Sequence, residues 1–194
     1  MKTVIQRVKS ASVTVDGQLI SSISKGLLIF AAIGKDDTEK EAISMASKVL
    51  KVKLWDDGES KWKKNVQDID GDVLCVSQFT LLASTKKGNK PDFHKSAPAA
   101  KGKELYDSFI GQVRKLYSED KVKDGVFQAM MDVSLVNDGP VGVDYRCEDE
   151  AVTIEIDTNP PEMKNPSGLQ PPEEGDTLKT HVHKTFELPA SLLE

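Results

Sequence analysis

Two short polar segments of the 194-residue chain each follow a run of apolar residues and could do chemistry. Ser77-Gln78-Phe79-Thr80 brings two hydroxyls and an amide to the end of an expected strand. Asn137-Asp138-Gly139-Pro140 stops another run at a turn, because Asn, Asp and Gly tolerate positive φ and proline fixes φ. Gly139 has no Cβ, so its carbonyl and that of Pro140 could point into a pocket as fixed acceptors. An ordinary turn between two strands is the alternative.

The side chains alone do not assemble a known catalytic group. A nucleophilic Ser77 or Thr80 needs a neighbouring base, and among three histidines only His94 lies before residue 159. There is no GxSxG elbow around Ser77. The sequence also lacks HExxH, paired CxxC, GxxxxGK[ST] and GxGxxG. We therefore expect no metal and no cofactor.

Ser77–Leu81 (SQFTL) and Asn137–Val141 (NDGPV), in this order and at this separation, resemble the signature segments of the D-aminoacyl-tRNA deacylases. The likeness covers most of residues 1–141 and resumes at Val152–Thr158. It implies a hydrolase that cleaves the ester bond of D-aminoacyl-tRNA, and of glycine mischarged on tRNA-Ala. The products would be the free amino acid and tRNA.

The resemblance also implies a role for each segment, the two facing each other across the active site. The catalytic segment is Ser77, Gln78, Phe79 and Thr80. Its backbone N–H groups at Phe79 and Thr80 would stabilise the developing oxyanion while the 2′-hydroxyl of the RNA assists, without an essential protein nucleophile.

Chiral selection would fall to the second segment, in which Gly139 and Pro140, joined by a cis bond, place their carbonyls where an L side chain would lie. Asn137 belongs to the same substrate-binding turn, and Arg7 would support it from behind with five donors in a fixed fork.

A third group, Phe127, Met130 and Met131, would line the pocket for the terminal adenine, which a ring and thioethers could sandwich. Ordinary core packing is the alternative for these three residues.

The chain departs from the family after Val141, where the family continues into a Thr and a short strand. Here residues 142–151 intervene before a strand-like VTIEID, so either Thr153 replaces the usual Thr or that Thr is absent. The insertion carries four acids and one Arg, and we expect it to loop into solvent. Residues 159–194 hold six of the nine prolines and are expected to form an extended tail after a deacylase domain of residues 1–158.

Charge and composition allow an RNA partner without demanding one. The formal net charge is −5, of which residues 159–194 contribute −3. Lysines gather at Lys61, Lys63 and Lys64 and again at Lys86, Lys87, Lys90, Lys95, Lys101 and Lys103. Such a cluster could attract phosphates, or it could be a solvated face. Cys75 and Cys147 form no disulfide framework, and no apolar run could span a membrane, so a cytoplasmic protein is expected.

Hydrophobic patterning supplies the elements that must position these segments. A strand is expected over 2–8, followed by alternation of apolar residues at Ala11, Val13 and Val15. Further strands are expected over 18–23 and 27–33, with Asp16-Gly17 as a hairpin turn, and over 52–55, 72–79, 126–136 and 152–157. Helices are expected after a capping box at Thr38–Glu41 and over Ala99–Tyr117.

The order of these elements favours a single α/β domain of two packed sheets with both helices on one side. The resemblance implies a three-layer β/β/α fold with mixed, barrel-like packed sheets. The family further implies a homodimer in which the Gly-Pro turn of one subunit completes the pocket of the other, with aminoacyl-tRNA as partner. A non-catalytic module that binds an RNA end or a protein remains the competing class.

Overall fold

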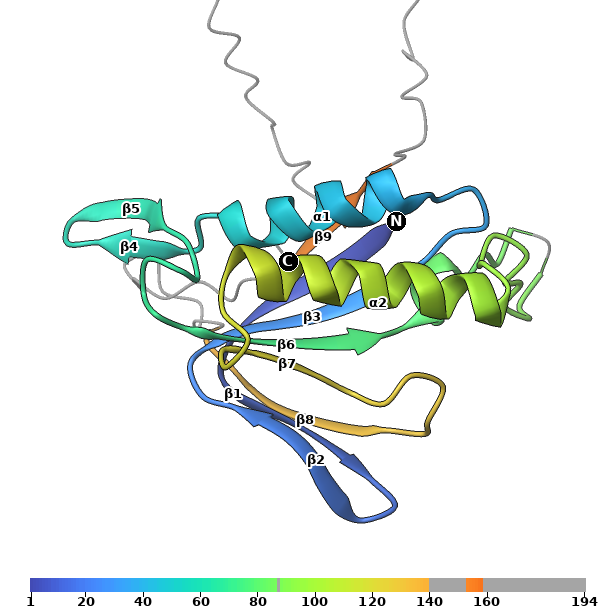
Figure 1. Ribbon diagram of the computed structural model, residues 1–194, viewed down its shortest axis with the longest axis horizontal. Helices are drawn as coiled ribbons and strands as arrows, with labels where there is room; N and C mark the ends of the chain where they lie inside the picture. Colours follow the sequence, from blue (N-terminus) through green and yellow to red (C-terminus); the bar gives the residue numbers. More distant parts are fainter. Residues whose placement is uncertain (87, 140–152, 159–194) are drawn as a thin grey trace, which may run out of the picture. The chain divides into compact units, whose positions relative to one another are not determined.

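The computed structural model describes residues 1–86, 88–139 and 153–158 (Figure 1). Contacts group the described residues into one compact unit. Predictions about Pro140, the insertion 142–151, Cys147 and the tail 159–194 fall outside the described residues. The domain boundary at residue 158 therefore stays a prediction.

The described chain alternates strands with two long helices. Its elements are β1 Lys2–Val15, β2 Gln18–Ile23, β3 Gly26–Ala32, α1 Glu39–Lys51, β4 Trp55–Asp57, β5 Ser60–Lys64, β6 Asp72–Ser77, the 3-10 turn η1 Phe79–Leu82, α2 Ala99–Leu116, β7 Val122–Asp124, β8 Asp132–Asn137 and β9 Thr153–Asp157.

Strand β1 organises the sheet because four strands pair with it. Its first half pairs antiparallel with β3 and β9, and its second half pairs antiparallel with β2 and β8. The register shifts between Val8 and Ser10 against β8, and between Val13 and Thr14 against β2. Such irregularities bend a strand and increase its twist. The single seven-stranded sheet thus folds over itself, as Figure 1 shows, with β6 and β7 added in parallel to β3.

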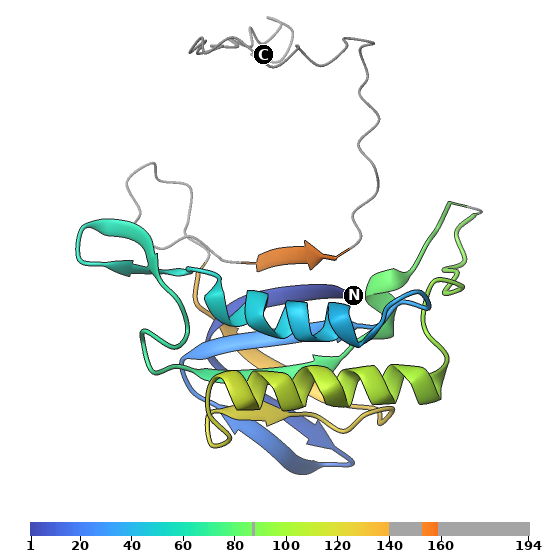
Figure 2. The same ribbon diagram turned by 45° about the horizontal axis from the view of Figure 1, so that its top comes forward.

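Both helices lie on one face of the sheet, side by side (Figure 2). Their apolar stripes bury residues such as Met45, Val49, Phe109 and Val113 against β3, β6 and the first half of β1. A second, smaller core fills the space between the two β layers and includes Val8, Val13, Leu28, Leu74 and Val76. The predicted three-layer β/β/α class is confirmed, and the two β layers are continuous through β1.

Two local predictions, the Asp16-Gly17 hairpin turn and the capping box at Thr38–Glu41, are confirmed. Asp16 and Gly17 both have positive φ, +50° and +77°, as a two-residue hairpin of this type requires. Thr38 and Glu41 form the reciprocal capping box at the start of α1. Among the described residues, no helix has both the length and the apolar composition that a membrane crossing requires.

The predicted strand over 126–136 is wrong in its first half. Ala129 N–H donates to the Val126 carbonyl, and Gln128 has φ +64°, so residues 126–131 turn and β8 begins only at Asp132. The strand expected at 52–55 is also displaced, because β4 starts at Trp55 and forms a separate hairpin with β5. The expected strand 72–79 ends at Ser77, where η1 takes over.

Two glycines give a matched test of the β3–β6 contact. A Cβ on Gly26 would lie 1.9 Å from the Asp72 carbonyl oxygen, so Gly26→Ala must separate the parallel strands and should lower the free energy of unfolding by about 3 kcal/mol or more. Gly111 in α2 has nothing within 4 Å of such a Cβ, so Gly111→Ala should raise stability by about 0.5–1 kcal/mol. Urea denaturation of both variants checks this, and equal effects would contradict the described packing.

Candidate functional site

A cavity of about 770 Å3 opens where β6 ends, between the sheet and the first turns of α2. Its walls come from four parts of the chain. These are the end of β3, the residues after β6, the start of α2 and the 126–131 turn, contributing among others Ala31, Ala32, Ser77, Gln78, Phe79, Ala99, Gly102, Tyr106, Phe127, Met130 and Met131. The volume falls within the usual range for small-ligand sites.

The predicted catalytic segment turns sharply at the mouth of this cavity. Gln78 N–H still donates to the Ala31 carbonyl at 2.8 Å, extending the β3–β6 pairing by one residue. Leu81 N–H then donates back to the Gln78 carbonyl and starts η1. Within the described part of the chain, the N–H groups of Phe79 and Thr80 have no acceptor, as is usual in the first turn of a helix.

The side chains of this segment are arranged around the turn. Ser77, Gln78 and Phe79 line the cavity, whereas Thr80 does not and instead accepts a hydrogen bond from the Gln78 amide. Phe79 is 58% exposed, and its ring packs edge-on against Phe93 with 5.1 Å between the ring centroids. The segment therefore presents main-chain donors beside a half-exposed aromatic ring.

His94, the only histidine that sequence analysis could offer as a base, pairs with a carboxylate of its own loop. Its Nδ1 lies 2.6 Å from Asp92 Oδ2, and both side chains are well exposed. No hydrogen bond joins His94 to Ser77 or Thr80 in the described structure. The arrangement gives no support to a serine-hydrolase triad.

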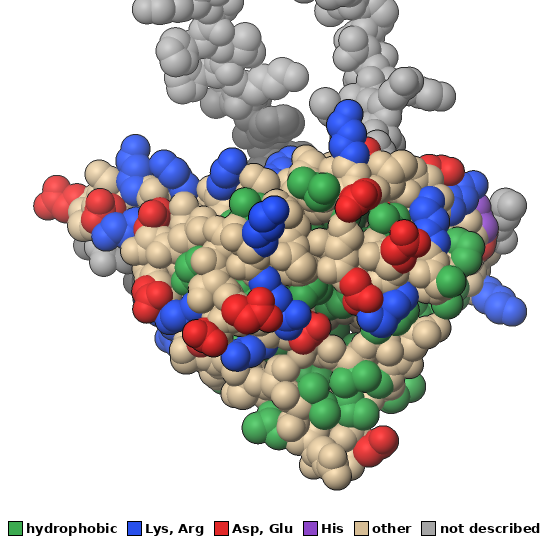
Figure 3. Space-filling model, in the orientation of Figure 1, with side chains coloured by type: hydrophobic (Ala, Val, Ile, Leu, Met, Phe, Trp, Pro, Cys, Tyr) green, Lys and Arg blue, Asp and Glu red, His purple; other side chains and the backbone are tan. Residues whose placement is uncertain are grey.

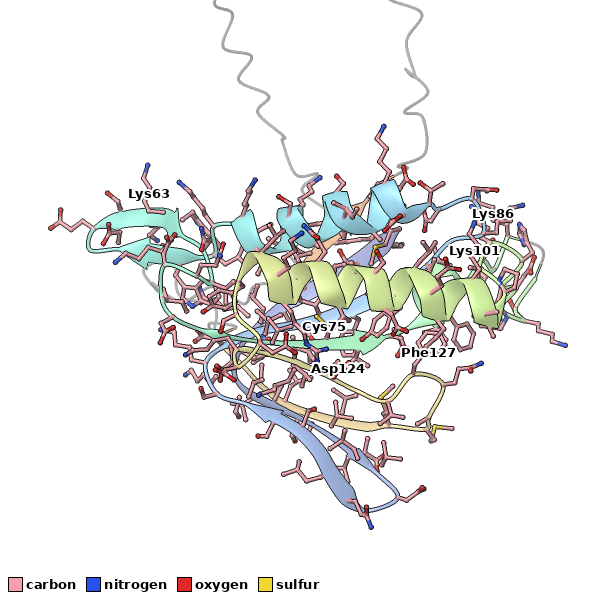
Figure 4. All side chains as sticks on the ribbon, in the orientation of Figure 1. Lys63, Cys75, Lys86, Lys101, Asp124 and Phe127 are labelled. Carbon is pink, nitrogen blue, oxygen red and sulfur yellow. The ribbon has the colours of Figure 1, made fainter. Side chains whose placement is uncertain are left out.

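The three residues predicted for the adenine pocket all line the same cavity. Phe127 lies beneath the start of α2, 5.7 Å from the Tyr106 ring, with the Lys103 ammonium 5.8 Å from its own ring (Figure 4). Met130 is 89% exposed, which core packing does not explain. The structure thus brings the Phe127–Met131 turn and the Ser77–Phe79 segment to one site.

Tyr106 is a cavity residue within the helix predicted over Ala99–Tyr117, and the sequence had given it no role in the site. Its hydroxyl is buried and has no hydrogen-bond partner in the described residues. Burial, with smaller contributions from Cys75 and Asp124, holds the pKa of Tyr106 well above its ordinary value. It is therefore a neutral donor or acceptor. The signal available in sequence was Gly102, four residues earlier, which leaves the same helix face open toward the cavity.

The predicted chiral-selection group lies at the opposite end of the sheet. Asn137 pairs with Val8, and Val8 pairs with Gly26 at the start of β3, whereas Ser77 pairs with Ala31 near its end. Gly26 and Ala31 are five residue steps apart along β3, which is roughly 17 Å. Within one chain, Gly139 and the Ser77–Thr80 segment therefore do not face each other.

The turn at Gly139 is nevertheless held firmly. Gly139 has φ +110°, a conformation that favours glycine, and its carbonyl accepts a hydrogen bond from the Asn137 amide at 3.0 Å. Arg7, only 8% exposed, donates to the Asp138 carbonyl at 3.2 Å and to the Leu54 carbonyl at 2.7 Å. Its Nε also lies 3.2 Å from the Asp138 carboxylate. The resemblance implied that Arg7 supports this turn, and in the structure Arg7 binds Asp138, the residue before Gly139.

The predicted lysine cluster divides into two groups (Figures 3 and 4). Lys61, Lys63 and Lys64 lie on β5, whereas Lys101 and Lys103 lie in the first turns of α2 beside the cavity, with Lys101 donating to the Lys35 carbonyl at 2.7 Å. Lys87 falls outside the described residues. Within the described ranges, no group of three or more His, Cys, Asp or Glu is placed to bind a metal ion.

Fold and site together define an α/β protein with a folded-over sheet, two helices on one face and a cavity at a strand end. A family model described as D-Tyr-tRNA(Tyr) deacylase matches residues 4–145. The chain belongs to this family, so the membership predicted from the two segments is confirmed. It is accordingly a hydrolase that acts on ester bonds.

The names of similar sequences agree with this family. A D-aminoacyl-tRNA deacylase of Yarrowia lipolytica is 52% identical over 148 residues, covering 75% of this chain and 96% of that protein. D-aminoacyl-tRNA deacylase 1 of Homo sapiens is 46% identical over 145 residues, covering 74% of this chain and 69% of that protein. A solved structure named c-Myc DNA Unwinding Element Binding Protein is 43% identical, with a TM-score of 0.73, over 82% of this chain and 100% of that chain.

Arg7→Lys tests the support of the turn. A lysine cannot reproduce the fork that reaches Leu54 and Asp138, so we expect a loss of about 2–4 kcal/mol in the free energy of unfolding. Arg114→Lys is the matched control, because Arg114 also bridges two carboxylates but its side chain is 29% exposed. It should cost under about 1 kcal/mol. Similar losses in urea denaturation would show that Arg7 makes no special contribution.

Proposed function

We propose that this chain hydrolyses the ester of D-aminoacyl-tRNA, and of glycine mischarged on tRNA-Ala, to free amino acid and tRNA. The observation that carries the proposal is the single cavity shared by Ser77–Phe79 and by Phe127–Met131. It offers an apolar, aromatic wall for a nucleobase beside main-chain donors for the reacting carbonyl. This arrangement suits the 3′ end of a charged tRNA.

The chemistry assigned to the site needs little from side chains. An aminoacyl ester is activated, and the vicinal ribose 2′-hydroxyl lies beside the acyl group. The N–H groups of Phe79 and Thr80, which lack acceptors in the described residues, would stabilise the oxyanion that forms as water attacks the carbonyl. Holding the ester against these donors converts a bimolecular reaction into an effectively unimolecular one.

Selection against L-aminoacyl esters is assigned to the carbonyls of Gly139 and Pro140, which would occupy the space of an L side chain. A D side chain would point away from them, and glycine would fit. Because Gly139 lies at the far end of its own sheet from the cavity, these carbonyls would have to come from a second copy of the chain. The separation therefore supports a homodimer in which each turn enters the partner's cavity.

The competing class, a non-catalytic module that binds an RNA end or a protein, explains fewer features of the site. Such a module needs a surface, whereas the site is a cavity beside main-chain N–H groups that have no acceptor in the described residues. We place the reaction in the cytoplasm, a proposal supported by Cys75, a free thiol in the core.

Filling the cavity tests the activity. The wild-type protein should release amino acid from D-Tyr-tRNA and spare L-Tyr-tRNA. A Cβ on Gly102 has room, with its nearest neighbour Phe127 at 3.7 Å, but the longer side chain of Gly102→Leu would enter the cavity. We expect kcat/KM to fall about 10²-fold. Gly111→Leu, the same change on the outer side of α2, should leave kcat/KM unchanged. Absence of D-selective hydrolysis by the wild type would refute the proposed function.

Removing the two hydroxyls tests the assignment of chemistry to the main chain. Ser77→Ala and Thr80→Ala should each keep deacylation within about tenfold of the wild type, the scale of one lost hydrogen bond. Loss of a true nucleophile would lower kcat on the order of 10⁶-fold. A folded Thr80→Ala variant that binds D-Tyr-tRNA but no longer hydrolyses it would restore the nucleophile.

A further inference from the structure

The β4–β5 hairpin is a two-stranded sheet of its own, with no strand of the main sheet beside it (Figure 1). It follows α1 directly, and Leu54 N–H closes its base by donating to the Lys64 carbonyl at 2.9 Å. The deacylation site described above uses none of its residues. Its position and side chains therefore call for a separate explanation.

The hairpin presents free positive charge and an aromatic ring. Lys61 and Lys63 are exposed and pair with no carboxylate in the described residues, whereas Lys64 contacts Asp57 at 2.7 Å. Figure 3 shows several Lys or Arg side chains among acidic ones at this end of the molecule, and Lys63 extends outward from the hairpin in Figure 4. Between the two lysines, Trp62 is 40% exposed and has φ +56°, a conformation rare for a bulky residue. The Asp56 carboxylate holds it there by accepting from Trp62 N–H at 2.7 Å.

Arg7 connects this hairpin to the Gly139 turn. One guanidinium nitrogen binds the Leu54 carbonyl at the base of the hairpin, and another binds the Asp138 carbonyl beside Gly139. The two features are thus fixed to one buried side chain. Wherever the Gly139 turn docks, the hairpin accompanies it.

The hairpin is remote from the cavity of its own chain. Helix α1 leads from the cavity end of the molecule to the hairpin, and its 13 residues span roughly 20 Å. In the proposed homodimer, however, Gly139 enters the cavity of the partner subunit. The hairpin would then stand at the mouth of that cavity, where the acceptor stem of the bound tRNA emerges.

We propose that Lys61 and Lys63, with Trp62 between them, bind the phosphate backbone of the aminoacyl-tRNA whose 3′ end occupies the partner subunit's cavity. The inference rests on the proposed homodimeric deacylase and adds an RNA contact made in trans. Exposed lysines suit duplex RNA, which proteins bind chiefly through phosphates and 2′-hydroxyls. The contact carries no base recognition, so it would strengthen binding of any tRNA.

Two substrates separate RNA binding from chemistry. Lys61→Gln/Lys63→Gln should lower kcat/KM for D-Tyr-tRNA about tenfold at about 50 mM salt. The slope of its logarithm against that of the salt concentration should become shallower by about 1.4–1.8. For D-tyrosyl-adenosine, which has no stem, kcat/KM should not change. Lys115→Gln/Lys123→Gln removes the same charge from exposed lysines elsewhere, which pair with no carboxylate among the described residues, and should change neither value. Wild-type rates on D-Tyr-tRNA, or equal losses on both substrates, would overturn the RNA contact.

Mixed dimers decide whether the contact is made in trans. In a dimer of one Lys61→Gln/Lys63→Gln chain and one Gly102→Leu chain, the only open cavity faces an intact hairpin of the partner. Each such dimer should show the kcat/KM of one wild-type site on D-Tyr-tRNA. A tenfold reduced value would mean that the hairpin serves its own cavity and would overturn the proposal. Sedimentation of the wild type as a monomer would instead refute the homodimer, and an inactive wild type would refute the deacylase.

Discussion

The pairing of β1 with four other strands is the constraint on which the rest of the structure depends. One strand of 14 residues can have two sets of neighbours only if it bends, and the register shifts near Val8 and Val13 supply the bend. The bend divides the sheet into two layers with separate cores. Strand direction then fixes the ends, because β3 and β6 run toward the cavity while β8 runs away from it. The two segments that the proposed reaction requires are thereby placed at opposite ends of the chain's own sheet.

The separation bears on the role of the turn at Asp138 and Gly139, which Arg7 supports through hydrogen bonds. Arg7 is nearly buried and uses its guanidinium on main-chain carbonyls and one carboxylate rather than on a substrate. Burying such a charge is unfavourable unless its donors are satisfied. A domain that only had to fold could have used an apolar residue there. The observed hydrogen bonds fix the carbonyl direction at Asp138 and Gly139, as the proposed role of the Gly139 carbonyl in chiral selection would require.

Sequence was informative where a few neighbouring residues decide the outcome. The Asp16-Gly17 turn, the Thr38 capping box and the stripe of α2 are local, and each formed as predicted. The strand predicted over Val126–Val136 was wrong in its first half, because alternation of apolar residues cannot reveal that Gln128 adopts positive φ and turns the chain. The cavity wall at Tyr106 and the link from Leu54 to Asp138 join residues far apart in sequence, so no local pattern could reveal them. The two motifs were identified by their likeness to a known family. Their placement at opposite ends of the sheet became evident only from the strand topology.

A site built from main-chain groups constrains the protein differently from a catalytic triad. Replacing a side chain removes a triad member at once, but the N–H groups of Phe79 and Thr80 persist in any sequence that keeps the turn. What must be maintained is the turn itself, through the Gln78–Ala31 hydrogen bond, the η1 carbonyls and the packing of Phe79 on Phe93. Selection on such a site acts on backbone geometry. The same logic applies to Gly139, whose carbonyl accepts from the Asn137 amide while Arg7 donates to the Asp138 carbonyl beside it. Both halves of the proposed mechanism thus depend on residues that hold the main chain in place.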